Sequence, residues 1–360
     1  MADHRLWTRR SLLKSLGLGA AAAAGALPKP GFAAPRELDD GFRMLFLTDT
    51  HLDMKCSKDN LSHIAQWITR NAAELNIQYV AHHGDVGDRR GTGGIGEMLK
   101  DCRQALQPVM DAGIPMSVAI GNHDYDSASD TRPCNAFNDP AAFGREFYEG
   151  QPWFGGTFEE EAGEPGQDPG GTANHYVLSD VGGRSFLFLT LELYPRDKVM
   201  AWADGLVKDT YPDREVIVNT HAYLHRQGHL ASGVGYDGFS RTPGPEYSND
   251  GEEMWERYFR TWANLRLVSG GHFIDEPRQN YLEQTGDHGN TVHSQFWNYQ
   301  NWGYEDGELY NTRREGQYQA AMVKMFDVRL DDGEVHIENY IPPAGVEGEP
   351  ADPDYHDTWG

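Results

Sequence analysis

The sequence predicts an α/β fold with four layers, in which two mixed sheets pack face to face between outer layers of helices. The first observation is an alternation of short apolar runs and amphipathic stretches over residues 43–120, which is typical of a parallel sheet with crossover helices. The second is the last part of the chain, where alternating polar and apolar residues and tight turns are typical of antiparallel strands. A parallel half and an antiparallel half together indicate two sheets.

The parallel half contains three strands and two helices. RMLFLT, IQYVAHH and PMSVAI are short apolar runs that fit buried strands, and the stretches between them repeat apolar residues at helical spacing. The second helical stretch ends at a glycine, which often terminates a helix. The predicted order is strand 43–48, helix 61–75, strand 77–83, helix 96–113 and strand 115–120.

Residues 125–174 are interpreted as an insertion loop, because they are rich in Gly, Pro, Asp and Glu and contain one short helical pattern, DPAAFGREFY. After it, helices are predicted at RDKVMAWADGLVKDT and EEMWERYFRTWANL. The predicted strands are HYVLSD, RSFLFLTLEL, EVIVNT, LRLV, TVHSQFWN, AAMVKMFDVRL and EVHIENYI. We place the domain at 42–345 and expect residues 346–360 to form an acidic tail.

Residues 1–34 are interpreted as an export signal. Arg9 and Arg10 form a twin-arginine pair, and the weakly apolar run of Ala, Gly and Leu that follows is too short to span a bilayer. Small residues near Ala33 and Ala34 offer a cleavage site. The pattern resembles signals that carry folded proteins through the twin-arginine translocation machinery. We therefore expect a periplasmic or extracellular protein with no membrane association after signal removal.

The charge and cysteine content limit the classes of partner and fold. The chain has 55 acidic and 31 basic residues and a formal net charge of −24 at pH 7. Such a charge repels nucleic acids, since phosphate backbones bind basic surfaces, so no polymeric DNA or RNA is expected. The three cysteines have no CxxC spacing and are too few for a disulfide framework.

Polar clusters stand at the ends of the predicted strands. In FLTDTHLD, Asp49 and His51 are two residues apart, which in an extended segment points both side chains the same way. Further clusters are GDVGDRR, GNHDYD, NTHAYLH and SGGHF. The carboxyl ends of parallel strands form a binding edge. Carboxylate, imidazole and amide groups together favour Zn, Fe or Mn over Ca.

The ordered motifs D-x-H, GDxxD, GNHD, an isolated His and GH resemble the calcineurin-like metallophosphoesterases over roughly residues 43–342. Stretches such as PDREVIVNTHAYL are similar to a secreted bacterial or archaeal branch. The resemblance implies a two-sheet sandwich flanked by helices, in agreement with the pattern above. It also implies a metal-dependent phosphoric ester hydrolase with two transition-metal ions (Mn, Zn or Fe). The acidic charge favours a small phosphate mono- or diester as substrate.

The resemblance implies six metal ligands, which are Asp49, His51, Asp85, Asn122, His221 and His272. Of these, Asp85 would bridge both ions, the first two residues would complete the first site, and the last three would complete the second. A hydroxide bridging the ions would then attack phosphorus in line with the leaving group.

Three further residues receive roles from the resemblance. His123 would act as the general acid that protonates the leaving oxygen, and Asp88 would orient its imidazole. Arg89 matches an arginine that grips phosphate in the Ser/Thr phosphatase branch. A surface salt bridge is the alternative role for Arg89.

The chain departs from the family pattern at its last motif. Relatives usually have GHxH, whereas here Ile274 takes the place of the second histidine and cannot coordinate a metal. Either Asp275 or Glu276 replaces it, or the first site keeps three protein ligands and holds its ion less firmly. The same departure leaves an alternative function open, that of a catalytically weakened or non-catalytic exported relative that binds metal or another ligand.

Overall fold

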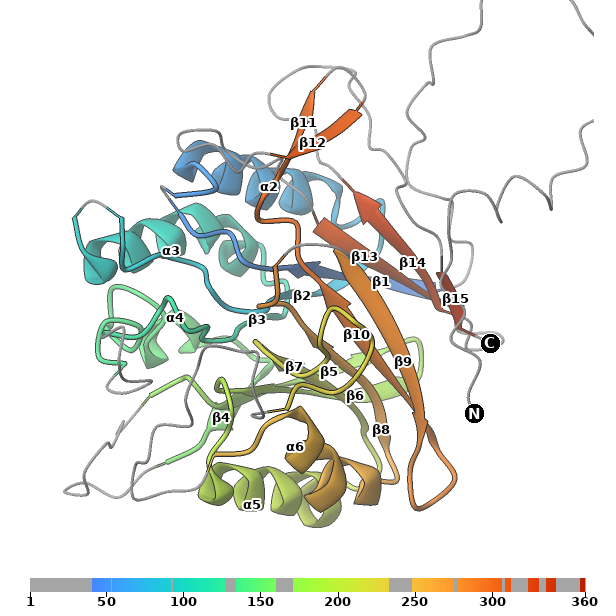
Figure 1. Cartoon of the computed structure of the whole chain (residues 1–360). Coiled ribbons are helices and arrows are strands. Elements are labelled where there is room, and N and C mark those ends of the chain that lie inside the picture. The colour runs from blue at the N-terminus through green and yellow to red at the C-terminus, as the bar shows by residue number, and fades with distance from the viewer. Residues whose placement is uncertain are drawn as a thin grey trace, which may run out of the picture. The chain divides into compact units, whose positions relative to one another are not determined.

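Figure 1 shows the computed structural model of the chain. Every residue that the structure describes belongs to the second of two compact units, Phe32–Gly360. The expected export signal, Asp275, Glu276 and most of the expected acidic tail lie outside the described residues. The described residues are 41–52, 54–91, 93–126, 134–159, 171–232, 248–274, 278–305, 308–311, 323–329, 335–340 and 357–359. Of these, residues 302–305, 308–311, 338–340 and 357–359 are described by their backbone alone.

The first sheet has six strands in the order β15-β14-β13-β1-β2-β3. Strands β1, β2 and β3 are parallel, as the βαβαβ pattern predicts, and β13, β14 and β15 add antiparallel neighbours. All of β1 and almost all of β2 are buried, which explains why both strands have apolar sequences. The bounds are β1 Gly41–Leu47, β2 Ile77–His82, β3 Met116–Val118, β13 Val323–Arg329, β14 Val335–Tyr340 and β15 Asp357–Trp359.

The second sheet has seven strands in the order β4-β5-β6-β7-β8-β10-β9. Its four central strands from β6 to β10 are parallel, and β4, β5 and β9 pair antiparallel at its two edges. Strands β11 Trp302–Glu305 and β12 Glu308–Asn311 form a separate pair. The bounds are β4 Phe154–Thr157, β5 His175–Val181, β6 Arg184–Leu191, β7 Glu215–Thr220, β8 Leu265–Gly270, β9 Gln279–Thr285 and β10 Thr291–Trp297.

The helices form the outer layers (Figure 1). Helices α2 and α3 lie along the first sheet, and α5 and α6 lie along the second. Side chains cap two of them, because Ser57 accepts a hydrogen bond from the Asn60 backbone and Asp250 forms a capping box with Glu253. No helix in the described part of the chain has the length and apolarity to cross a bilayer. The bounds are α2 Lys58–Asn71, α3 Ile95–Asp111, α4 Arg145–Tyr148, α5 Asp197–Gly205 and α6 Gly251–Arg257.

Aromatic side chains join the two sheets. Tyr79 of β2 stacks on Phe188 of β6 with ring centroids 3.7 Å apart, and Phe42 of β1 meets Phe186 of β6 edge to face at 5.3 Å. These rings form the core between the sheets, so the prediction of two mixed sheets with helices outside is confirmed.

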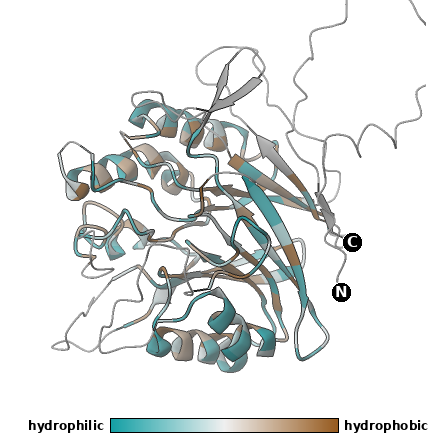
Figure 2. Ribbon diagram, in the orientation of Figure 1, coloured by the Kyte–Doolittle hydropathy of each residue, from teal (hydrophilic) through white to brown (hydrophobic). Residues whose placement is uncertain are grey.

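Several elements differ from the sequence prediction. Strands β11, β12 and β15 were not predicted, and β15, within the expected acidic tail, pairs with β14 and extends the first sheet. Strand β9 was not predicted, because its residues, QNYLEQT, are mostly polar and partly exposed on both faces of a sheet edge, and it is mainly hydrophilic in Figure 2. Within the expected insertion loop, β4 pairs with β5 and extends the second sheet. The helix predicted at EEMWERYFRTWANL ends early, at Arg257. Trp262 is fully buried and donates from Nε1 to Asp204 Oδ1 at 2.7 Å, which anchors the chain before it enters β8.

A buried histidine in β5 is expected to make stability depend on pH. His175 is fully buried and its Nδ1 lies 2.7 Å from the Thr172 carbonyl oxygen, so the neutral ring donates to that oxygen. Burial lowers the pKa of His175 to about 4, below the unfolded value of about 6.5. Between these values the unfolded chain binds more protons, so the free energy of unfolding falls as the pH decreases, by up to about 3 kcal/mol from this group.

Urea unfolding of the wild type and of His175→Asn at pH 7 and pH 4.5 measures this contribution, since the asparagine amide nitrogen takes the place of Nδ1 as donor to Thr172 but does not titrate. The variant should lose less stability than the wild type over this interval. An equal loss in both proteins would contradict the assignment of the effect to His175.

Candidate metal centre

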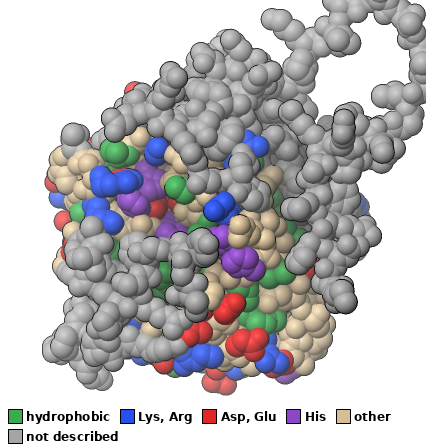
Figure 3. All heavy atoms as spheres, in the orientation of Figure 1, with side chains coloured by type: hydrophobic (Ala, Val, Ile, Leu, Met, Phe, Trp, Pro, Cys, Tyr) green, Lys and Arg blue, Asp and Glu red, His purple; other side chains and the backbone are tan. Residues whose placement is uncertain are grey.

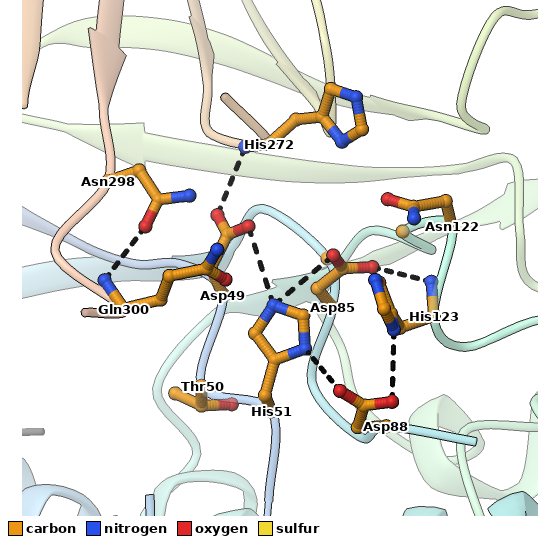
Figure 4. A network of polar contacts seen from close by, with 12 residues as sticks. Asp49, Thr50, His51, Asp85, Asp88, Asn122, His123, His272, Asn298 and Gln300 are labelled. Carbon is orange, nitrogen blue, oxygen red and sulfur yellow. Dashed lines mark hydrogen bonds and ion pairs between the residues drawn. The ribbon is translucent and has the colours of Figure 1, made fainter. Parts of the chain in front are cut away.

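Loops at the carboxyl ends of five strands bring the six predicted ligands together. Figure 4 labels all of these ligands except His221. Two ligands follow β1, and one ligand follows each of β2, β3, β7 and β8. The first three strands belong to one sheet and the last two to the other, so the centre lies where the two sheets meet. In this order the ligands are Asp49, His51, Asp85, Asn122, His221 and His272.

Asp85 lies in the middle of the centre. Its Oδ2 atom is 3.4 Å from His51 Nε2 and 3.3 Å from His221 Nε2, on two different sides. Its Oδ1 atom accepts a hydrogen bond from the His123 backbone N–H at 2.7 Å. One carboxylate therefore faces two groups of candidate ligands, as a bridging ligand must.

Two clusters of ligand atoms share Asp85. One consists of His51, Asp85 and His123, and the other of Asp85, His221 and His272, with all ligand atoms of each cluster within 4.8 Å of one another. His221 Nε2 also lies 3.1 Å from Asn122 Oδ1 and 3.1 Å from His272 Nδ1. The second cluster together with the neighbouring Asn122 thus comprises all the ligands expected for the second ion.

The backbone at four of these ligands has the left-handed conformation. The φ angles are +47° at Asp49, +40° at His51, +52° at Asp85 and +74° at His272. Residues with a Cβ rarely adopt this conformation, and it is concentrated at functional sites. The expectation that Asp49 and His51 share a direction because their segment is extended was therefore wrong. A strained turn, and not strand alternation, aims both side chains at the centre.

Glycines in the motifs allow the loops to approach one another. A Cβ on Gly84, which has φ of +99°, would lie 2.6 Å from the Gly121 backbone nitrogen. A Cβ on Gly121 would overlap Asp85, and one on Gly271 would overlap the side chains of Thr48 and Asp49. Glycine is required at these three positions because the ligand loops touch there.

Asp124, the last residue of the GNHD motif, holds two ligand loops together through hydrogen bonds. The sequence did not predict this role. Its buried carboxylate accepts from the backbone N–H groups of Val86, Gly87 and Gly121 at 2.9 to 3.2 Å. It therefore ties the loop after β2 to the loop after β3. Burial and the nearby charge of Asp85 raise the pKa of Asp124 to about 7.

The electrostatics of the centre favour bound cations. Burial alone lowers the pKa of His51, but the neighbouring carboxylates, led by Asp85, outweigh burial and raise it to about 10. Burial also lowers the pKa of His221, and Asp85 and Asp49 raise it to about 9. In contrast, burial and the neighbouring His221 lower the pKa of His272 to about 3, so its ring is neutral at pH 7. The buried carboxylates thus attract positive charge into the centre.

The donor set fits transition-metal ions. His51 Nε2 is buried and has no hydrogen-bond partner, while its Nδ1 lies 3.1 Å from Asp88 Oδ2. His221 Nδ1 lies 2.8 Å from the carbonyl oxygen of His83, which can only accept a hydrogen bond. In both rings, a hydrogen bond at Nδ1 directs the Nε2 lone pair toward the centre, as is usual for metal-binding histidines. Carboxylate, imidazole and amide donors together suit Mn, Fe or Zn.

Asp88 contacts three cationic or titratable groups. It lies 3.0 Å from His123 Nδ1 through Oδ1, which is the contact expected for an orienting carboxylate. It also contacts His51, and it accepts a forked hydrogen bond from Arg90, whose Nε is 2.9 Å from Oδ1 and whose Nη2 is 2.5 Å from Oδ2. The contact to His51 shows a second positioning role that the sequence analysis missed.

The predicted phosphate-binding arginine, Arg89, does not line the pocket. Arg89 donates from Nη1 to the carbonyl oxygen of Asn122, and it is not among the residues that line the pocket. Its neighbour Arg90 does line the pocket. The phosphate-binding role of Arg89 stays a prediction.

A pocket of about 320 Å³ opens above the ligands. Its lining contains basic side chains from three separate loops and the apolar step Phe273–Ile274. Figure 3 shows Lys and Arg side chains beside histidines on this face of the molecule. The lining residues are His51, Lys55, Asp85, Arg90, Asn122, His123, His225, Arg226, His272, Phe273, Ile274 and Gln300.

Comparisons with known proteins agree with this centre. The family model described as Calcineurin-like phosphoesterase matches residues 42–274, which include all six candidate ligands. The Bacillus subtilis (strain 168) protein YvnB is 26% identical over 322 residues, which is 89% of this chain. The chain spans only 21% of the length of that curated relative.

Solved structures with similar chains include two metal phosphatases. Purple acid phosphatase PPD1 from yellow lupin (Lupinus luteus) has a TM-score of 0.46 at 14% identity, covering 92% of this chain and 55% of its own. A dimetal phosphatase from Danio rerio has a TM-score of 0.43 at 11% identity, covering 89% of this chain and 99% of its own.

Proposed function

The chain belongs to the calcineurin-like phosphoesterase family, and from this premise we propose that it hydrolyses a small phosphate mono- or diester with two transition-metal ions. The observation that carries the proposal is the position of Asp85 between two clusters of imidazole ligands, below a pocket lined by basic side chains. Asp49, His51 and Asp85 would hold the first ion, and Asp85 with the second cluster and its amide would hold the second. When bound, such ions supply a water molecule of lowered pKa and neutralise charge on the phosphoryl oxygens.

A histidine of the chain, His123, supplies the general acid. His123 is held through Nδ1 by Asp88, which fixes the ring and leaves Nε2 for a proton. Its side chain is 16% exposed and lines the pocket, so Nε2 can reach a bound ester. His123 therefore holds a proton where it can pass to the leaving oxygen.

Basic side chains at the pocket select the charge of the substrate. Lys55, Arg90 and Arg226 line it, although the chain carries a formal net charge of −24. The pocket therefore offers cations to an anionic ester, while the rest of the surface repels polyanions. This combination supports a small phosphate ester and not a nucleic acid.

Substitution of His123 by alanine tests the proposed function. The rate on an alkyl phosphate should fall by about 10²- to 10⁴-fold, because a poor leaving group needs a proton. The rate on p-nitrophenyl phosphate should fall by less than about 10-fold, because nitrophenolate leaves without one. His288→Ala, an exposed histidine in the turn between β9 and β10, is the matched control and should leave both rates unchanged.

Equal losses on the two substrates would contradict the general-acid role of His123. Comparison of bis-p-nitrophenyl phosphate with p-nitrophenyl phosphate, each with Mn²⁺, Zn²⁺ and Fe²⁺, separates diester from monoester hydrolysis. A wild type that binds metal but hydrolyses neither ester would support the alternative of a non-catalytic relative, which the replacement of a motif histidine by Ile274 suggests.

We also propose that residues 1–34 direct export by the twin-arginine machinery and that the mature protein is periplasmic or extracellular. The support is the sequence pattern around Arg9 and Arg10. Replacing both arginines by lysine should retain the unprocessed chain in the cytoplasm, as measured by cell fractionation. Unchanged export of the variant would show that the signal is of another type.

A further inference from the structure

The first metal position has fewer ligands than the second. At the position of the second histidine of the GHxH motif, Ile274 is 43% exposed at the pocket and offers no ligand atom. Asp275 and Glu276 lie outside the described residues, so the structure assigns neither of them. Another described residue at the pocket offers a ligand atom to the first position.

Gln300 supplies such an atom. It lines the same pocket as His51 and Asp85, and in Figure 4 its side chain extends toward Asp49 and His51. Its Oε1 atom is buried and has no hydrogen-bond partner. His51 Nε2 is also buried without a hydrogen bond, and its contacts are ion pairs of 3.4 Å to Asp85 and 3.8 Å to Asp49. Leaving a buried polar atom unsatisfied costs about 1–3 kcal/mol. Two such atoms at one pocket indicate a partner that both bind, and a metal ion accepts electron pairs from both an amide oxygen and an imidazole nitrogen.

The fold delivers Gln300 to this place through β10. Strand β10 runs parallel to β8, and Phe296 pairs with Gly270 near the carboxyl ends of both strands. The chain therefore leaves β10 beside the loop that carries His272. The segment after β10 lies next to the position that a second motif histidine would have occupied.

A hydrogen-bonded turn fixes the backbone of Gln300. The Asn298 side chain is almost fully buried, and its Oδ1 accepts from the Gln300 backbone N–H at 2.8 Å. The Asn298 backbone N–H donates to the Arg278 carbonyl oxygen at 2.7 Å, which ties the turn to the start of β9. This support on both sides of the turn is what a ligand-bearing segment needs to hold its geometry.

We propose that Gln300 Oε1 is a ligand of the first metal ion and replaces the missing second histidine of the GHxH motif. The proposal rests on the two-metal site of the proposed function. It gives the two sites a similar composition, because Asn122 offers an amide oxygen to the second ion. Replacing an imidazole by a neutral oxygen leaves the net charge of the site unchanged and favours an oxygen-preferring ion such as Mn²⁺ at the first position.

Calorimetric titration of metal-stripped protein with Mn²⁺ tests this proposal without an activity assay. The wild type should bind two ions. In Gln300→Leu, which removes the ligand atom, one of the two affinities should fall by at least about 10-fold and the other should stay unchanged. Gln300→Glu, which keeps an oxygen at this position, should retain both sites. Gln227→Leu makes the same chemical change at an exposed glutamine outside the pocket lining and should bind as the wild type does.

The outcomes separate this proposal from the proposed function. Two sites of wild-type affinity in Gln300→Leu would overturn the ligand role, and a raised KM in that variant would then assign Gln300 to the substrate. Loss of one site in both Gln300 variants would also overturn it, since the glutamate variant keeps an oxygen donor. A wild type that binds fewer than two Mn²⁺ ions would overturn the two-metal premise itself.

Discussion

Replacing Asp85 by asparagine is expected to lower kcat/KM for phosphate esters by at least about 10³-fold, because two ions that each stabilise charge contribute several kcal/mol to the transition state. Asp85 Oδ2 lies 3.3 to 3.4 Å from imidazole nitrogens of both clusters, and Asp85 is the residue that the two clusters share. The asparagine amide has one oxygen donor and no charge, whereas the carboxylate has two oxygen donors that share a negative charge. Mn²⁺ titration should therefore show at most one tightly bound ion in the variant.

A matched control separates this effect from a general loss of charge. Asp287→Asn removes a carboxylate that pairs with Arg260 in an exposed turn, and it should leave activity and Mn²⁺ stoichiometry unchanged. Two ions bound to Asp85→Asn with wild-type affinities would show that Asp85 does not bridge them. Circular dichroism of both variants checks that the fold persists.

Removing one partner of a buried ion pair is expected to have the largest effect on stability. Arg43 of β1 and Asp327 of β13 stand opposite each other in the first sheet, and both side chains are only 2% exposed. Arg43 donates from Nε to Asp327 Oδ1 at 2.6 Å and from Nη2 to Oδ2 at 3.3 Å. Asp327→Leu leaves a buried guanidinium without its counter-ion, so the free energy of unfolding should fall by about 3–5 kcal/mol.

Replacing both partners should cost much less. The double variant Arg43→Met with Asp327→Leu contains no buried charge at this position, and buried pairs replaced by apolar residues are often neutral or more stable. Urea unfolding of the wild type, both single variants and the double variant gives the coupling energy directly. A single-variant loss below about 1 kcal/mol would indicate that water reaches the pair.

The two arginines after GDxxD show where sequence reasoning stops. The resemblance gave Arg89 either a phosphate-binding role or a surface salt bridge, since it holds the matching position in the chain. The structure directs Arg89 to a backbone carbonyl and places Arg90 at the pocket, paired with Asp88. The side chains of adjacent residues in a turn point in different directions. Which of the two arginines reaches the pocket depends on the backbone angles of the turn, and these depend on contacts with the loop after β3.

The sequence pattern predicted the fold class and the order of the strands that carry ligands, and the resemblance of the motifs to a known family implied the six candidate metal ligands. These are local properties, because apolar runs form buried strands and each ligand lies a few residues after the end of such a run. Three features become visible only in the folded chain. They are the left-handed backbone of four ligands, the position of Arg90 at the pocket and the position of Gln300 at the same pocket. Each of these features depends on packing between segments that are far apart in the chain. The residue pattern of one segment does not predict which side chains of a distant segment it will contact.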